Sequence, residues 1–289
     1  MGIVVAVLTA KGGTGKTTTA VNLALGLGHR LAFEAREAGR DEFDDVIIID
    51  CDPQGNAGDY VGAHAQMFHP TRNPDGACLS RVLRGEMTAL DALVEVRENV
   101  WLLPATPALN DAVEDIALLS ATKAARGRRA ESLRDVFKKR LAPLAKQARF
   151  VILDCPPNPG LLEVPITDFA DYVISPVQLQ YLSVMGVIQF AQSLKTLRNE
   201  EKVKAQIACV VPSMTSPYRD GAPFQVAERQ MLDELVQVFG ATRMSPAIEL
   251  GAKVKEAPGV HQSIFELAPA SSQARAYGHL VNKVYAYGK

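Results

Sequence analysis

The sequence has few cysteines, and no two of them stand at the short spacing of a structural zinc site. Its four cysteines lie far apart along the 289 residues: Cys51, Cys78, Cys155 and Cys209. Without a C-x-x-C pair, neither a zinc site nor a disulfide framework is predicted. We therefore expect reduced thiols, as in a protein of the cytoplasm.

Strong net charge and long apolar runs are absent as well. The 31 basic and 32 acidic residues leave a net charge of -1, which excludes a general attraction to nucleic acid or to anionic lipid. Any such binding must come from a local basic patch. No segment approaches the ~18 apolar residues of a membrane span, and the N-terminus lacks the basic lead of a signal peptide. These absences predict a soluble protein that is not exported.

Short runs rich in valine and isoleucine are present, and segments of helical period separate them. Six runs are apolar enough for strands buried on both faces: residues 3–8, 46–50, 100–104, 150–154, 172–177 and 207–212. Helices are expected near residues 16–28, 108–119, 129–148, 182–198, 223–239 and 271–287. This alternation predicts an α/β fold with a mostly parallel sheet and helices on both faces, in a single domain over residues 1–289. Turn-forming residues predict loops at His69–Ala77 and Ser213–Pro223.

The segment AKGGTGKTTTA, from Ala10 to Ala20, follows the first apolar run and opens the first expected helix. It departs from the phosphate-loop pattern G-x-x-x-x-G-K-[ST] only at its first position, where alanine replaces glycine. Glycines let backbone N–H groups turn toward phosphate oxygens, and the helix directs its positive end there. We expect Lys16 to reach the terminal phosphates and Thr17 to ligate magnesium. The rest of the predicted nucleotide cradle is Gly12, Gly13, Thr14, Gly15 and Thr18. The alternative is a glycine-rich turn without a ligand.

The loop KGGTGKTT resembles the deviant phosphate loop, K-G-G-x-G-K-[ST], of the ParA/MinD family of ATPases. Later segments are similar to the family as well: DCDPQGN from Asp50, DCPP from Asp154, SPVQLQ from Ser175 and KEAP from Lys255. The similarity covers essentially the whole chain and is nearest to the small ParA-type partition proteins.

This resemblance implies a P-loop ATPase that uses ATP and Mg²⁺ and forms a homodimer when ATP binds. In the family the early lysine crosses the dimer interface to the partner's nucleotide, and that role is implied for Lys11. Asp52 would orient the attacking water, unless it only caps the turn-forming sequence DPQGN. Asp50 and Asp154 each end an apolar strand at the carboxyl edge of the sheet, where they would hold magnesium.

The resemblance also implies a function for the dimer. It would bind nucleoid DNA and position a plasmid, a chromosome or another cargo, while a ParB-like or other adaptor protein stimulates hydrolysis. The expected location is the cytoplasm, in association with the nucleoid.

Two local features fall outside these motifs. Cys51 and Cys155 stand beside the two aspartates, but strand alternation points them away from the site, so we expect them in the core. Between Lys16 and Asp52 the chain has more residues than the family usually shows. The charged segment AFEAREAGRDEF is expected to lengthen the first helix or to add a surface helical turn.

Two basic surfaces are candidates for binding double-stranded DNA. The stretch Lys123–Arg149 has ten basic residues against two acidic ones. Its helical period places four cations opposite an apolar face: Arg134, Lys138, Lys139 and Arg140. An ordinary solvated helix face is an equally open interpretation. The second candidate is a C-terminal group: Lys253, Lys255 and Arg275. In ParA-like proteins a basic residue at the position of Lys253 helps to bind the DNA backbone without sequence preference.

Relatives in the same superfamily offer other functions. A MinD-like membrane-surface switch needs a basic amphipathic tail, whereas HLVNKVYAYGK, from His279, is typical of a packed helix. A tyrosine kinase would carry a larger C-terminal cluster than Tyr277, Tyr285 and Tyr287. An iron–sulfur ATPase would need cysteines placed to bridge two subunits, and these cysteines do not match that pattern. We therefore expect no membrane partner.

Overall fold

All six apolar runs form strands of one sheet. The computed structural model describes every residue except 1, 41, 64–75, 220–221, 224 and 289. The sheet has eight strands in the order β10-β7-β6-β1-β5-β2-β4-β3, and within it only β3 runs antiparallel to its neighbour. Its strands are β1 Ile3–Val7, β2 Val46–Asp50, β3 Val94–Arg97, β4 Val100–Leu103, β5 Phe150–Asp154, β6 Tyr172–Gln178, β7 Gln206–Thr215 and β10 Ile248–Glu249. The predicted mostly parallel α/β sheet is confirmed.

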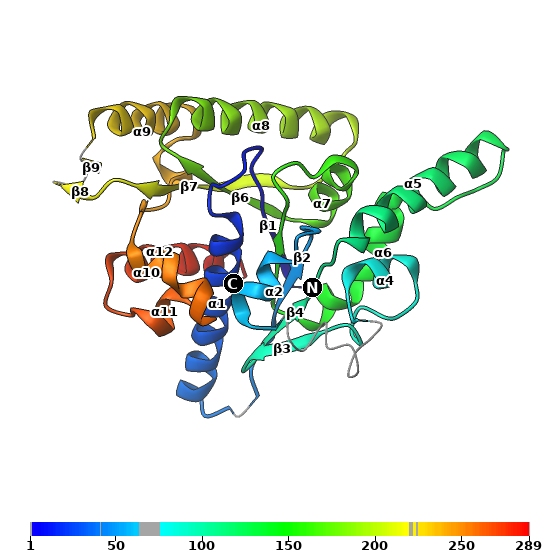
Figure 1. Cartoon of the computed structure of the whole chain (residues 1–289), viewed down its shortest axis with the longest axis horizontal. Helices are drawn as coiled ribbons and strands as arrows, with labels where there is room; N and C mark the ends of the chain where they lie inside the picture. The colour runs from blue at the N-terminus through cyan, green and yellow to red at the C-terminus, as the bar shows by residue number, and fades with distance from the viewer. Residues whose placement is uncertain (1, 41, 64–75, 220–221, 224, 289) are drawn as a thin grey trace.

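Helices cover both faces of this sheet, as Figure 1 shows. Successive residues of β1 separate the two faces: Val4 and Ala6 join one buried cluster, whereas Val5 and Val7 join the other. The first face is covered by α4 Leu79–Arg84, α5 Ala108–Ala125, α6 Leu133–Gln147, α7 Glu163–Phe169, α8 Tyr181–Glu200 and α9 Val226–Phe239. The second is covered by α1 Lys16–Glu37, α2 Asn56–Val61, α10 Ala252–Glu256, α11 Ile264–Leu267 and α12 Ser272–Tyr285.

The six predicted helices are present with shifted ends, and several short elements were missed. The charged segment after residue 31 does lengthen the first helix, because α1 continues to Glu37. The predicted loop at Ser213–Pro223 was wrong in part, since β7 continues to Thr215 and a short hairpin follows, β8 Tyr218–Arg219 with β9 Ala222–Pro223. Most of the predicted loop at His69–Ala77 lies outside the described residues. The short helices and strands β3 and β10 carry too few apolar residues to show a period.

One helix leaves the body of the molecule. In α5 only Leu109, Ala112 and Val113 are buried, all within its first two turns. From Glu114 to Ala125 the helix has no buried residue, and Leu118 is 69% exposed. Figure 1 shows this part of α5 projecting away from the sheet beyond α4 and α6.

Candidate nucleotide-binding site

The predicted phosphate loop connects β1 to α1 at the carboxyl edge of the sheet. Gly15 caps α1 with a φ of 84°, and Gly13 has a φ of 70°. Both conformations are left-handed and strained for a residue with a Cβ, so glycine is required at these two positions. The first N–H groups of α1 have no partner within the helix and carry its positive dipole end, which makes the loop suitable for an anion.

Lys16 is turned inward beneath this loop. Its side chain is buried, and its Nζ donates a hydrogen bond to the carbonyl oxygen of Lys11 at 3.0 Å. Burial lowers the pKa of Lys16, and the carboxylates of Asp154 and Asp52 oppose that shift. A partly desolvated ammonium held by one backbone carbonyl is well placed to exchange that carbonyl for a phosphate oxygen.

Lys11 lies at the rim of the loop and is held within its own chain. Its Nζ donates to Ser183 Oγ at 3.0 Å, and Ser183 lies buried in the first turn of α8. Contact with a second subunit would therefore require Lys11 to leave Ser183. The role of Lys11 across a dimer interface stays a prediction.

Two side chains from neighbouring strands hold the loop from below. Gln178, at the end of β6, donates through Nε2 to the carbonyl oxygen of Gly13 at 2.9 Å. Ser213, in β7, donates through Oγ to the carbonyl oxygen of Thr14 at 2.8 Å. The sequence placed Gln178 in a family motif but gave no signal for Ser213, which lay in a segment predicted to be a loop.

The two strand-ending aspartates stand side by side. Asp50 and Asp154 are register partners on the neighbouring parallel strands β2 and β5, and both are fully buried. Asp50 Oδ1 accepts the backbone N–H of Asp52, and Oδ2 accepts that of Ala57. Burial and the neighbouring Asp154 raise the pKa of Asp50 well above its usual value.

Asp154 differs from Asp50 because no hydrogen bond of regular geometry reaches either of its carboxylate oxygens within the described structure, although the Thr17 hydroxyl lies near enough to act on them. Burial raises the pKa of Asp154 to about 7, although the hydroxyl of Thr17 acts in the opposite direction. A buried carboxylate without a partner is costly, and a hard cation would satisfy it. Thr17 and Asp154 therefore fit Mg²⁺. Binding of Mg²⁺ by Asp50, whose two carboxylate oxygens accept backbone N–H groups, stays a prediction.

No group of three or more His, Cys, Asp or Glu side chains in the described part of the chain could hold a metal by itself.

Asp52 begins the turn that follows β2. It is buried, and its Oδ1 accepts the backbone N–H of Gln54 at 3.0 Å. The turn-capping interpretation is therefore correct as geometry, and orientation of water by Asp52 stays a prediction.

Cys51 and Cys155 are both buried in the core cluster that contains Val4 and Ala6 of β1, and burial raises the pKa of both thiols. They are core residues, as predicted.

A cavity of about 220 Å³ adjoins the phosphate loop on the side of β7 and α10. Gly15 and Thr18 form one wall, and Met214, Leu250 and Pro258 contribute apolar surface. A planar heterocycle linked to phosphates in the loop would fit such an apolar slot. Sequence analysis did not predict this cavity, because its walls come from segments far apart in the chain.

The C-terminal basic group lies on and beside α10. Lys253 is exposed and forms an ion pair with Glu256 one turn along, at 2.8 Å, while Lys255 borders the cavity described above. Arg275, on α12, donates to the carbonyl oxygen of Ala270 at 2.7 Å. The two lysines thus lie two residues apart on one short helix, and DNA binding by this group stays a prediction.

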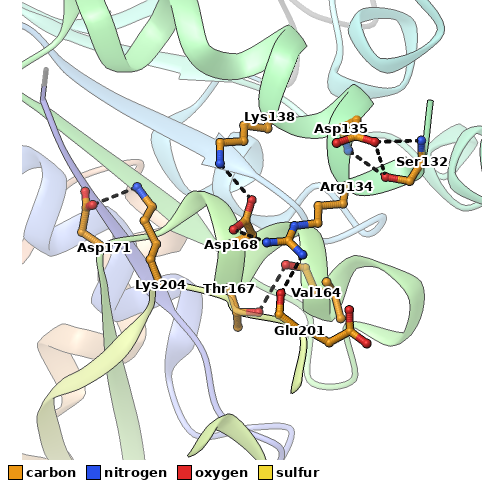
Figure 2. A network of polar contacts seen from close by, with 10 residues as sticks. All are labelled: Ser132, Arg134, Asp135, Lys138, Val164, Thr167, Asp168, Asp171, Glu201 and Lys204. Atoms are coloured by element: carbon orange, nitrogen blue, oxygen red, sulfur yellow. Dashed lines mark hydrogen bonds and ion pairs between the residues drawn. The ribbon is translucent and has the colours of Figure 1, made fainter. Parts of the chain in front are cut away.

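The basic face of α6 has a different environment, which Figure 2 shows. Arg134 and Lys138 both reach Asp168 on α7, at 2.7 and 3.2 Å. Arg134 also donates to the carbonyl oxygen of Glu201. Burial alone would raise the pKa of Asp168, but the hydrogen bonds and charges of the two cations outweigh it and hold that pKa below its usual value. These two cations therefore join α6 to α7 and to the end of α8.

The apolar face predicted for α6 is confirmed, since Leu133, Phe137, Leu141 and Leu144 are all buried.

Among the described helices, none combines the length and the apolar character that a membrane span requires. Fold and site together define a phosphate-loop nucleotide-binding protein of the mostly parallel α/β class.

Comparisons with known proteins agree with this class. A family model described as an AAA domain matches residues 2–207. The chromosome-partitioning ATPase Soj of Thermus thermophilus is 31% identical over 98% of this chain and 95% of its own length. The sporulation initiation inhibitor protein Soj of Bacillus subtilis is 28% identical over 100% of both chains. The solved Cyanothece McdA(D38A)–ATP complex has a TM-score of 0.76 at 20% identity, covering 99% of this chain and 96% of that one.

The chain belongs to the ParA/MinD family of deviant Walker-motif ATPases. The family predicted from the phosphate loop is confirmed, and so are ATP hydrolysis and the use of ATP and Mg²⁺ as properties of that family.

Proposed function

We propose that this chain is a ParA-type ATPase that closes into an ATP-dependent sandwich dimer. The dimer binds double-stranded DNA without sequence preference and positions a plasmid, a chromosome or another cargo. A ParB-like or other adaptor stimulates hydrolysis and so releases the dimer from nucleoid DNA. The supporting observation is the pair of lysines at one loop, with Lys16 turned into its own phosphate site and Lys11 on the outer rim.

The residues of the site divide the chemistry among them. Lys16 and the first N–H groups of α1 bind phosphate oxygens, and Thr17 with Asp154 would hold Mg²⁺. When bound, Mg²⁺ neutralises charge on the phosphates, which is the main requirement of phosphoryl transfer. Asp52 orients the water that attacks the terminal phosphate. The cavity beside Gly15 holds the base of the nucleotide.

Sedimentation with ATP separates the roles of the two lysines. Lys16→Ala should abolish ATP binding, because it removes the ammonium that faces the chain's own phosphates. Lys11→Ala should still bind ATP but fail to form the dimer. A Lys11→Ala protein that dimerises like the wild type would contradict the role across the interface.

Hydrolysis tests Asp52 separately. Asp52→Ala should bind ATP with nearly unchanged affinity and remain dimeric, because loss of the positioned water slows turnover. Normal turnover in this variant would leave Asp52 as a turn-capping residue only.

DNA binding separates this function from the MinD-like alternative. The ATP-bound dimer should bind unrelated double-stranded DNA sequences alike, and increasing salt should weaken the binding steeply. If the ATP-bound protein instead ignores DNA at low salt and sediments with anionic vesicles, the proposal is wrong and a membrane-surface switch takes its place.

A further inference from the structure

His261 lies between α2 and the 3-10 turn that follows α10, the helix that carries the C-terminal lysines. Its ring Nδ1 lies 2.9 Å from the carbonyl oxygen of Asp59, on α2. Because a carbonyl only accepts, Nδ1 is the donor in this contact. On the other side, the His261 backbone N–H donates to Pro258, in the 3-10 turn η3 Ala257–Val260 directly after α10.

The backbone of His261 is held in a conformation that histidine rarely adopts. Its φ is 55° and its ψ is 36°, in the left-handed region. Such a conformation costs about 1 kcal/mol or more for a residue other than glycine and persists only where its surroundings enforce it. Arg97 supplies that constraint: its Nη2 donates to the His261 carbonyl at 2.6 Å, and its Nε pairs with Glu266 at 2.7 Å.

The C-terminal end of α2 lies close against the His261 ring. Gly62 ends α2 with a φ of 76°, and a Cβ added there would lie 3.0 Å from His261 Cγ. A side chain at this position would therefore push the histidine ring away from α2. The close approach of the ring and the positive φ at residue 62 both favour glycine there.

Backbone contacts connect α2 to the reacting end of the site. Gly55, at the start of α2, donates its N–H to the carbonyl oxygen of Asp52, and Ala57 donates to the buried Asp50 carboxylate. A displacement of the Asp52 turn therefore displaces α2 and the Asp59 carbonyl. The ring of His261 meets this carbonyl from the C-terminal segment.

We propose that His261 is a positioning residue that couples the nucleotide state of the Asp52 turn to the DNA-binding lysines of α10. This inference rests on the proposed function, because it requires that Lys253 and Lys255 bind DNA in an ATP-dependent manner. His261 transmits a shift of α2 to η3 and so to the adjoining α10. The strained backbone gives the contact a fixed geometry, which a flexible surface side chain would not have.

Two substitutions separate the ring contact from the backbone strain. His261→Gly removes the ring and adopts a positive φ readily, so the fold should be retained. His261→Asn also tolerates the left-handed region, and its side-chain amide nitrogen occupies the same position along the side chain as Nδ1. Asparagine should therefore keep the hydrogen bond to Asp59, whereas glycine should lose it.

The readout is the ratio of DNA affinities with a non-hydrolysable ATP analogue and with ADP, measured on one DNA duplex. We expect His261→Gly to reduce this ratio at least about five-fold, the lower range of coupling between two sites. His261→Asn should restore most of the ratio. By linkage, DNA should increase analogue affinity less in the glycine variant, by the same factor. His279→Asn, at an exposed position of α12, is the control and should leave the ratio unchanged.

The outcomes distinguish this inference from the function on which it rests. If the wild type shows the same DNA affinity with both nucleotides, the proposed function fails. If the wild type discriminates and His261→Gly discriminates equally well, the coupling role is wrong. Equal loss in the glycine and asparagine variants also overturns it, because the side-chain hydrogen bond would then be irrelevant.

Discussion

Two basic helices of this protein, α6 and α10, carry lysines of similar exposure whose carboxylate partners differ in burial. The side chain of Lys138 is 58% exposed and that of Lys253 is 52% exposed. Their carboxylate partners differ: the Asp168 side chain is 6% exposed, whereas that of Glu256 is 46% exposed. The burial of the partner, and not the exposure of the lysine, distinguishes the two helices.

This difference separates a structural cation from an available one. A buried carboxylate must keep its cations, because losing them leaves an unpaired charge in the interior. An exposed carboxylate hydrates easily, so its lysine can exchange it for a DNA phosphate at little cost. The stretch that contains α6 is the most basic in the sequence, but two of its cations serve a buried carboxylate. DNA binding by Lys253, Lys255 and Arg275, which the family resemblance implies, stays a prediction.

The largest expected effect concerns the buried partner. Asp168→Ala should lower the free energy of unfolding by about 2–4 kcal/mol, because it removes two charge-assisted hydrogen bonds and their packing. Urea unfolding measures this loss. Glu256→Ala is the matched control and should change the stability by less than about 0.5 kcal/mol. Equal losses in the two variants would remove the distinction between the helices.

Acid should reduce the stability difference between the wild type and a variant that lacks the Asp168 carboxylate. The pKa of Asp168 is lowered in the folded protein, so its contribution is present above the unfolded pKa of about 3.9 and is lost as the pH falls through the folded pKa. The stability gap between the wild type and Asp168→Asn should stay constant from pH 7 to about pH 5 and shrink below about pH 4. A gap that widens on acidification would mean that the two cations do not stabilise the carboxylate.

Substitution on α10 should affect DNA affinity more than substitution on α6, whereas the order was the reverse for stability. Lys253→Glu should weaken binding of the ATP-bound dimer about ten-fold on two unrelated duplexes alike, with a shallower dependence on salt. Lys138→Gln should change affinity by less than about two-fold, because its charge already serves Asp168. Fluorescence anisotropy over a salt series measures both. If Lys138→Gln causes the larger loss, α6 binds DNA.

The smallest expected effect is a gain. Glu256→Gln frees Lys253 from its ion pair and removes an acidic charge, which should increase DNA affinity about two-fold, in line with the few tenths of a kcal/mol of an exposed pair one turn apart. The same anisotropy series measures it. Unchanged or weaker binding would indicate that Glu256 holds Lys253 in its binding orientation.

The central features of the fold could be predicted because they are encoded locally. Six strands are buried on both faces and therefore appear as uninterrupted apolar runs, and the phosphate loop lies in sequence between its strand and its helix. The edge strand β3, with sequence VEVR, is short and alternates with charged residues. Its pairing with β4 depends on neighbours rather than on its own composition.

The rest of the site depends on contacts between distant segments. Nothing in the sequence near Lys11 indicates Ser183, and nothing near Arg134 indicates that Asp168 is buried. The basic stretch was visible as a composition, but its pairing comes from packing α6 on α7. Asp50 and Asp154 were predictable as strand ends, but their pairing comes from the strand register, and the difference in their hydrogen bonds within the described structure comes from the folded turn after β2.

The projecting end of α5 would amplify a rotation at the buried base of the helix. Its buried base includes Val113, which with Asn110 lines a cavity beside Pro53, the residue directly after Asp52. Asp115 still pairs with Arg84 on α4, and Ile116 packs against the core, so the unsupported part of α5 is residues 118–125, about 12 Å long at the rise of an α-helix. A rotation of about 10° at the base would carry the far end by about 2 Å, given that length. The tip of α5 would thus turn a small change of angle beside Pro53 into a displacement of atomic size.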